Sequence, residues 1–316
     1  MKIVITGALG HIGSKLIRSI GVDFPSADII MIDNMMTQRY CSLFNLPKGV
    51  RYTFIEADIT KIDLNKIFDG AHVIIHLAAI TDAAGSFDRE SELEANNFIS
   101  TKRVAEAAAL VGARLIAISS TSVYGTQSDV VSEDCTEDEL APQSPYAETK
   151  LKEERMLSDM VIEHGLKLVI CRLGTIFGVS PGMRFHTAVN KFCWQAAMGQ
   201  PITVWKTAYE QRRPYLDLVD ATRAMVFLIK NDIFDGRVYN IVTTNATVKE
   251  VVETIQEFVP SLNISFVESK IMNQLSYEVL SDRFRGLGFQ YTGNLRSAVS
   301  ETIAILKNIN HPKTTL

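Results

Sequence analysis

One stretch decides the fold: KIVITGALGHIGSKL, residues 2–16. A short β-branched run passes directly into a turn that contains Gly7, Gly10 and Gly13, and a segment with helical spacing follows. Glycines at these positions allow a tight turn, close approach of the backbone to a pyrophosphate, and close packing of the helix on the strand. The helix N-terminus adds amides and partial positive charge. The stretch therefore predicts the strand, turn and helix of a dinucleotide-binding site.

Further short apolar runs recur along the first half of the chain. They are DIIMID (28–33), YTFIE (52–56), HVIIHLA (72–78), RLIAISS (114–120) and LKLVICR (166–172). Runs this short and this apolar are typical of strands buried on both faces of a parallel sheet, and segments with helical spacing lie between them. The alternation predicts an α/β fold with a Rossmann-type doubly wound parallel sheet and a smaller, interleaved C-terminal substrate domain.

Asp33 ends the second run, 20 residues after Gly13, where a carboxylate can hold the adenosine ribose hydroxyls. The same charge would repel a 2′-phosphate, and the next basic residue is Arg39. We therefore predict NAD rather than NADP as the cofactor. The cofactor-binding prediction also includes three neighbours of these motifs, His11, Ile12 and Asn34.

Composition excludes several classes of function. The chain has 316 residues, 47% of them hydrophobic and 22% charged, enough to build one large domain or two interleaved ones. A net charge of -4 with mixed signs argues against nucleic-acid binding. No apolar run reaches the ~20 residues that span a bilayer, so we expect no membrane partner and a cytoplasmic location. The four cysteines form no CxxC pair, which argues against a zinc site or a disulfide framework; no metal is predicted.

Tyr146 and Lys150 stand four residues apart in SPYAETK (144–150). A free tyrosine has a pKa of ~10 and is a poor base at neutral pH, but a lysine one helical turn away favours the phenolate. Ser120 ends the RLIAISS run at the edge of the sheet where ligands bind in open α/β folds, and its hydroxyl can relay a proton. We predict these three as catalytic residues, with Tyr146 and Lys150 also contacting the cofactor. The structural alternative is a polar first turn of a helix.

Together these motifs resemble the extended short-chain dehydrogenase/reductase family that acts on nucleotide-activated sugars. The resemblance covers nearly the whole chain. It rests on the spacing GxxGxxG, Asp58-Ile59, HLAA (76–79), SSTSVYG (119–125), Tyr146-xxx-Lys150, RRPYLDLVDATRA (212–224) and LSDRFRGLGF (280–289). It implies NAD as cofactor and a nucleotide-activated sugar as substrate.

The resemblance also implies roles for further residues. Asp58 and Ile59 should flank the adenine, and Asn97 should support the neighbouring loops. Three residues should line the cofactor: Leu77, Ala78 and Ala79. Arg213 should contact phosphate, since a guanidinium suits bidentate phosphate binding. The other predicted substrate-binding residues are Thr81, Ser120, Thr121, Thr175, Arg184 and Asn190.

The substrate side departs from the usual form of the family. Thr175 stands three residues after Arg172, where family epimerases often carry Asn. The following SPGMRFHTAVNKF (180–192) resembles a less common branch that includes nucleotide-heptose 4-dehydrogenases. Thr121 and Ser122 are neutral hydroxyls, which disfavours sugar dehydration. SSTSVYG is closer to the epimerase form of its motif, though reductases share it.

Three functions follow from these observations. The leading one is an NAD-dependent nucleotide-sugar epimerase that works through a transient 4-keto sugar, as in UDP-glucose 4-epimerase-like enzymes. The alternative in the same fold is a nucleotide-sugar 4-dehydrogenase or 4-reductase acting on a hexose or heptose. The third is a non-catalytic NAD-binding protein, and the presence of Ser120, Tyr146 and Lys150 counts against it.

Two interleaved domains are predicted. Residues 1–176 plus about 214–243 form the NAD-binding domain, and about 177–213 and 244–316 form the nucleotide-sugar-binding domain. Helices are expected around 90–111 and 146–164. In the family that the chain resembles, the equivalent pair often forms a four-helix dimer interface, so the resemblance implies a homodimer.

Overall fold

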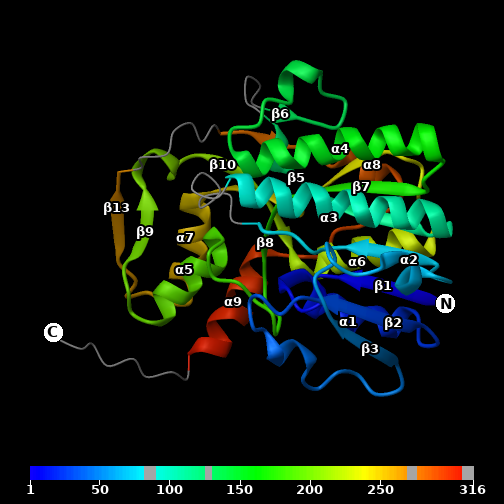
Figure 1. Ribbon diagram of the computed structural model, residues 1–316. Helices are drawn as coiled ribbons and strands as arrows, with labels where there is room; N and C mark the ends of the chain where they lie inside the picture. The colour runs from blue at the N-terminus through cyan, green and yellow to red at the C-terminus, as the bar shows by residue number, and fades with distance from the viewer. Residues whose placement is uncertain (82–89, 125–129, 269–275, 308–316) are drawn as a thin grey trace.

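The computed structural model describes residues 1–81, 90–124, 130–268 and 276–307. Its largest element is a seven-stranded parallel sheet (Figure 1), which confirms the predicted α/β fold. In spatial order its strands are β11 (Val238–Ile241), β7 (Leu168–Leu173), β5 (Arg114–Ser120), β4 (Val73–His76), β1 (Lys2–Thr6), β2 (Asp28–Asp33) and β3 (Arg51–Glu56). The strand order reverses between β1 and β4, and ligands bind such sheets at the carboxyl ends beside this reversal.

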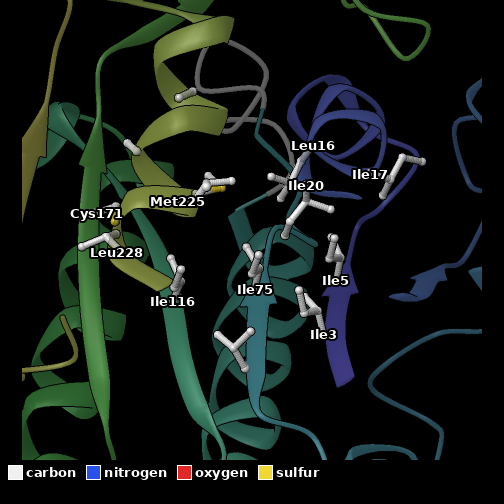
Figure 2. Packing of buried hydrophobic residues seen from close by; sticks show 14 of the residues in the cluster. Ile3, Ile5, Leu16, Ile17, Ile20, Ile75, Ile116, Cys171, Met225 and Leu228 are labelled. Carbon is white, nitrogen blue, oxygen red and sulfur yellow. The ribbon is translucent and has the colours of Figure 1, made fainter. Parts of the chain in front are cut away.

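Helices cover both faces of this sheet. Their bounds are α1 (His11–Asp23), α2 (Leu64–Phe68), α3 (Glu90–Val111), α4 (Pro145–His164) and α6 (Leu218–Lys230). On one face α1 and α6 pack against side chains that include Ile5 and Ile75 (Figure 2). On the other face α2, α3 and α4 pack against residues that include Val4. Neighbouring residues of a strand point to opposite faces of the sheet. Strands that have helices packed on both faces therefore need nearly continuous apolar runs.

Smaller sheets lie beyond the main one. The strands are β8 (Thr175–Phe177) with β10 (Arg212–Asp217) and β12 (Thr244–Thr247), β9 (Ile202–Trp205) with β13 (Ile264–Val267), and β6 (Val130–Val131) with β14 (Glu278–Val279). The remaining helices are α5 (Ala188–Ala197), α7 (Val248–Gln256), α8 (Asp282–Gly286) and α9 (Leu295–Leu306). Short 3-10 turns occur at Tyr40–Leu43, Thr121–Val123, Glu137–Glu139 and Lys206–Ala208. Residues of α5, α7 and α9 share a hydrophobic cluster with β9, β10 and β12.

The later half of the chain returns to the main sheet. β11 pairs with β7, and α6 packs on α1, whereas β10 belongs to the separate three-stranded sheet. The division into two interleaved domains stays a prediction. Over the segments that the structure describes, we find no helix with the length and apolar character of a membrane span.

Candidate active site

The glycine turn between β1 and α1 leaves no room for side chains. Gly7 has a φ of +65°, and a Cβ added to it would lie 2.6 Å from the Ala78 nitrogen. A Cβ on Gly13 would lie 2.4 Å from the Gly7 carbonyl oxygen. α1 begins after Gly10 with no side-chain cap, so the amides of its first turn are available to a ligand. This bare helix N-terminus, with no Cβ in the way, fits the pyrophosphate of a dinucleotide.

Asp33 lies beside this turn at the end of β2. Its carboxylate accepts hydrogen bonds from the amides of Leu9 and Met35, each at 3.0 Å. Arg39 lies close enough to interact with this charge; burial lowers the pKa of its guanidinium, and Asp33 opposes that shift. The backbone bonds fix the orientation of the carboxylate, and an acidic group in this place suits ribose hydroxyls.

A cavity of about 390 Å³ opens at this edge of the sheet. Fourteen of the predicted site residues line it: Gly7, Gly10, His11, Ile12, Gly13, Asp33, Asn34, Asp58, Ile59, Leu77, Ala78, Ala79, Thr81 and Arg184. They come from four separate stretches of the first half of the chain and from one segment after β8. The cavity fits the predicted cofactor, because it joins the pyrophosphate turn to the acidic ribose position.

Asn97 supports the wall of the cavity from behind. It is completely buried on α3, its Oδ1 accepts from the Ile80 amide at 2.8 Å, and its Nδ2 donates to the Ile80 carbonyl oxygen at 2.8 Å. Asp58 accepts hydrogen bonds from Thr60 and lies 3.2 Å from the Lys61 ammonium. Burial opposes ionisation of Asp58, but these donors hold the pKa of its carboxyl below the usual value.

Ser120 and Tyr146 meet at the carboxyl end of β5. The Ser120 hydroxyl accepts hydrogen bonds from the Ser122 amide at 3.2 Å and from the Ser122 hydroxyl at 2.9 Å. Tyr146 lies in the first turn of α4, which Ser144 caps by accepting from the Ala147 amide at 3.2 Å. Burial raises the pKa of the Tyr146 phenol above its ordinary value, and the Lys150 charge and a hydrogen bond with Ser120 offset this shift only in part. The phenol and the serine hydroxyl thus lie within hydrogen-bonding distance of each other.

Lys150 lies one turn further along α4 and is 4% exposed. Its ammonium donates to the Ile118 carbonyl oxygen at 3.0 Å and to Glu153 Oε2 at 2.9 Å. Burial lowers the pKa of Lys150, but Glu153 and Tyr146 more than offset this, so the net shift is upward. Lys150 therefore remains a cation beside the phenol.

The predicted substrate-side residues are less tightly grouped. Two of these residues, Arg184 and Thr81, are hydrogen-bonded: Arg184 Nη1 donates to the Thr81 hydroxyl. Both line the cavity. Thr121 follows Ser120 and is buried, with its hydroxyl donating to Leu173 O at 3.3 Å. Thr175 lies in β8, opposite Tyr215 of β10. Of these residues, Thr81 and Arg184 line the cavity, whereas Thr121 and Thr175 do not.

Arg213 and Asn190 differ in what they contact. The Arg213 guanidinium lies over the Tyr277 ring, 5.6 Å from its centroid, and is half-buried in β10. Asn190 is completely buried; its Oδ1 accepts from the Gly178 amide at 3.2 Å and its Nδ2 donates to Arg184 O at 3.0 Å. These contacts give Asn190 a structural role in the segment after β8. Substrate contacts of both residues stay predictions.

A larger hollow, about 580 Å³, lies between α2, α3 and α4. It is lined by residues such as Asp63, Arg103 and His164, and none of the predicted site residues contributes to it. Size therefore does not identify the active site here. The smaller cavity combines the glycine turn with the acidic strand end and is the better candidate. Ser120, Tyr146 and Lys150 do not line it, but Arg184, which does, lies close enough to Tyr146 to interact with its phenol.

A family model described as NAD dependent epimerase/dehydratase family matches residues 3–242, which include the glycine turn and all of α4. The chain belongs to the NAD-dependent epimerase/dehydratase family. This family consists of enzymes that act on nucleotide sugars, and NAD is their cofactor. The recognition made from the motifs, the enzyme class and the cofactor are thereby confirmed.

Relatives and solved structures agree with this family. One relative is a trifunctional UDP-glucose 4,6-dehydratase/UDP-4-keto-6-deoxy-D-glucose 3,5-epimerase/UDP-4-keto-L-rhamnose-reductase of Arabidopsis thaliana. The two sequences are 28% identical over 319 residues. The match covers 96% of this chain but only 46% of that longer protein. It is 28% identical to an uncharacterized UDP-glucose epimerase of Bacillus subtilis (strain 168), over 98% of this chain and 99% of the relative. The crystal structure of UDP-glucuronic acid 4-epimerase from Bacillus cereus, in complex with UDP-glucuronic acid and NAD, superimposes with a TM-score of 0.88 at 25% identity, covering 97% and 99% of the two chains.

Several residues at this family site were not predicted as functional. Arg39 and His186 line the cavity, and Glu153 pairs with Lys150. Arg39 belongs to none of the quoted motifs, and His186 lies in the segment SPGMRFHTAVNKF (180–192). Both reach the cavity from loops, outside the helices and strands. The signal for Glu153 was its position three residues after Lys150 on the same helical face. In the SSTSVYG motif, Gly125 lies outside the described residues.

Proposed function

We propose that this protein is an NAD-dependent nucleotide-sugar 4-epimerase. The observation that carries the proposal is the grouping of Ser120, Tyr146 and Lys150 at the carboxyl end of β5, beside a cavity that fits NAD. The likeness to a UDP-glucuronic acid 4-epimerase structure supports reaction at C4. Bound NAD would supply the hydride acceptor, held by the glycine turn and Asp33.

The chain's own residues would handle the proton. Tyr146 would take the proton of the sugar 4-hydroxyl, with Ser120 hydrogen-bonded to the same oxygen and Lys150 stabilising the phenolate. After the ketose has turned over, return of the hydride to the other face of C4 and of the proton from Tyr146 to the oxygen would complete an epimerisation with no net redox change. Thr81, Thr121, Thr175, Arg184, Asn190 and Arg213 are proposed to surround the sugar and its diphosphate.

A net 4-dehydrogenase or 4-reductase is the second candidate. It is favoured by the segment 180–191, which lacks the usual epimerase form and contributes Arg184 to the cavity. In that case the ketose would leave the site instead of turning over within it. A protein that binds NAD without catalysis is the least favoured, because it would have no use for the Ser120, Tyr146 and Lys150 group.

The test is incubation of purified protein with NAD and a panel of UDP-, GDP-, dTDP- and CDP-sugars, the UDP-sugars first. Formation of the C4 isomer without NADH supports the epimerase. Accumulation of NADH with a 4-keto product replaces it with the dehydrogenase, and no turnover of any sugar rejects the epimerase and the dehydrogenase.

Tyr146→Phe provides the residue-level test. This variant should bind NAD as the wild type does and lose turnover, because the phenol is the proton carrier. Full turnover in the variant would reject the assignment. Tyr40→Phe, at an exposed tyrosine in the Tyr40–Leu43 turn, is a matched control that should keep wild-type activity.

Three further parts of the proposal concern organisation. We propose a cytoplasmic enzyme with an NAD-binding and a nucleotide-sugar-binding domain, divided as the sequence predicts. We also propose a homodimer formed through α3 and α4, which lie side by side on one face of the sheet (Figure 1). Ile99 and Leu110 of α3 are 47% and 72% exposed in the single chain and would be covered by this contact. A monomeric mass by light scattering would reject it.

A further inference from the structure

Lys150 and Glu153 form a buried ion pair within α4. Lys150 Nζ lies 2.9 Å from Glu153 Oε2 and 3.0 Å from the Ile118 carbonyl oxygen. The two residues are only 4% and 3% exposed, so solvent ions screen the pair weakly. The ammonium is thus held in place from two directions, by its own helix and by β5.

Stability alone gives no reason for a carboxylate at position 153. Moving two opposite charges out of water costs free energy, and apolar residues in place of a buried pair are often as stable. Moreover, Glu153 Oε1 is buried and accepts no hydrogen bond from the described part of the chain. A buried acceptor without a donor is destabilising. The pair is better explained by an effect on the neighbouring reactive group.

That neighbouring group is Tyr146. Burial raises the pKa of its phenol, the Lys150 cation lowers it, and the Glu153 carboxylate raises it again. Arg184 and the hydrogen bond with Ser120 both lower it. Glu153 is therefore the carboxylate that opposes the effect of Lys150 on the phenol.

The other charged and titratable groups around the pair have partners of their own. Glu154 of α4 binds Arg172 of β7, with Oε2 2.6 Å from Nη2. His76 of β4 bonds to Thr6 and, toward α3, to Thr101; burial and the Lys150 charge lower its pKa to about 3, so it is neutral at working pH. None of these can replace Glu153 as the direct counter-charge of Lys150.

We propose that Glu153 is a positioning residue of this site, which fixes the Lys150 ammonium beside Tyr146 and balances its charge, and so sets the pH above which Tyr146 works as a base. This inference rests on the proposed function, in which Tyr146 carries the proton. It assigns a measurable effect on the pH dependence of turnover to a buried side chain that acts through Lys150.

The first measurement is the pH profile of kcat/KM. Glu153→Gln keeps the size and the hydrogen-bond acceptor but removes the charge, so the acid limb should move to lower pH by about one unit. Glu153→Asp keeps the charge, so its acid limb should stay at the wild-type pH while kcat falls. Glu94→Gln on α3 removes the exposed partner of Lys152, a lysine of α4, and should leave the profile unchanged. An acid limb that stays in place in Glu153→Gln, or moves equally in Glu153→Asp, overturns the proposal.

The second measurement needs no sugar substrate. Ultraviolet difference titration of the phenolate, corrected with the Tyr146→Phe variant of each background, should show Tyr146 ionising at lower pH in Glu153→Gln than in the wild type. Identical titrations overturn the role of Glu153. If the wild type turns over no sugar, the proposed function fails, while this titration still decides the role of Glu153.

Discussion

His11 Nε2 donates to the Gly178 carbonyl oxygen at 2.9 Å, across 167 residues of sequence. Two more bonds accompany it: Ser180 Oγ donates to His11 O at 2.9 Å, and the Gly182 amide donates to Ser14 Oγ at 2.9 Å. The segment after β8 is therefore fastened to the first turn of α1. Substitutions in that segment should therefore change the affinity for NAD.

Gly182→Ala tests this fastening. A Cβ at position 182 would lie 2.3 Å from Leu9 O and 2.6 Å from Gly10 O, backbone atoms that can shift only by moving the glycine turn. We expect destabilisation of about 1–3 kcal/mol together with weaker NAD binding. Urea unfolding and calorimetric titration with NAD measure the two effects. Gly286→Ala, where an added Cβ meets nothing within 4 Å, is the control and should leave NAD binding unchanged.

Asp33→Asn tests cofactor choice. The amide keeps the size and one acceptor but removes the charge that favours ribose hydroxyls and repels a 2′-phosphate. NAD affinity should fall by about tenfold, which corresponds to ~1.4 kcal/mol, and the preference for NAD over NADP should shrink. Calorimetry with both cofactors measures this. Asp28→Asn, at the opposite end of β2, serves as control, and an unchanged ratio of the two affinities in Asp33→Asn would contradict the assigned role.

His76 gives the fold a dependence on pH. Burial and the Lys150 charge lower its pKa from 6.5 to about 3, so its charged form is disfavoured in the folded state. Above the pKa of His76 in the unfolded state, about 6.5, this effect does not change the free energy of unfolding. As the pH falls below that pKa, the protein becomes less stable, because only the unfolded state takes up the proton. At pH 5 this loss is about 2 kcal/mol for one such histidine. His11, with a pKa lowered to about 4 mainly by burial, adds a loss of the same sign.

The difference in unfolding free energy between pH 7 and pH 5 measures this effect. His76→Asn should reduce the difference by about 2 kcal/mol, whatever its effect on stability at pH 7. His164→Gln, at an exposed histidine near the end of α4, is the matched control. A difference that His76→Asn leaves unchanged would show that His76 is not the titrating group.

Glu154→Gln should destabilise the fold strongly. Glu154 pairs with the buried Arg172. The substitution removes the carboxylate charge and leaves the Arg172 guanidinium buried without a counter-charge, which is destabilising. We expect a loss of about 3–5 kcal/mol in urea unfolding. The surface pair Arg296 and Glu257 provides the comparison, since Glu257→Gln should cost at most about 1 kcal/mol. Equal losses of unfolding free energy in Glu154→Gln and Glu257→Gln would contradict the view that burial makes the Glu154–Arg172 pair the more important one for stability.

Most of the main sheet could be predicted from the sequence. The runs that became β1, β2, β4, β5 and β7 are mainly apolar because both faces of each strand are covered, and such runs stand out. For β3 the prediction of a strand buried on both faces was wrong, because β3 is the edge strand of the sheet and none of its residues is buried. β8 and β12 could not be predicted in this way. They are short, carry mixed residues and pair with β10 in a separate sheet, so their strand character comes from the partner.

The sequence by itself determined the local parts of the site: the glycine turn, the acidic end of β2, and Tyr146 one helical turn before Lys150. Each depends on residues close in the chain, whose spacing is set by backbone hydrogen bonding and by the helical repeat. Only the tertiary structure decided which distant groups complete it, such as Arg184 at Thr81 and His11 at Gly178. Contacts of that kind depend on how helices pack on the sheet and where the connecting loops run, and no periodic pattern in the sequence records them.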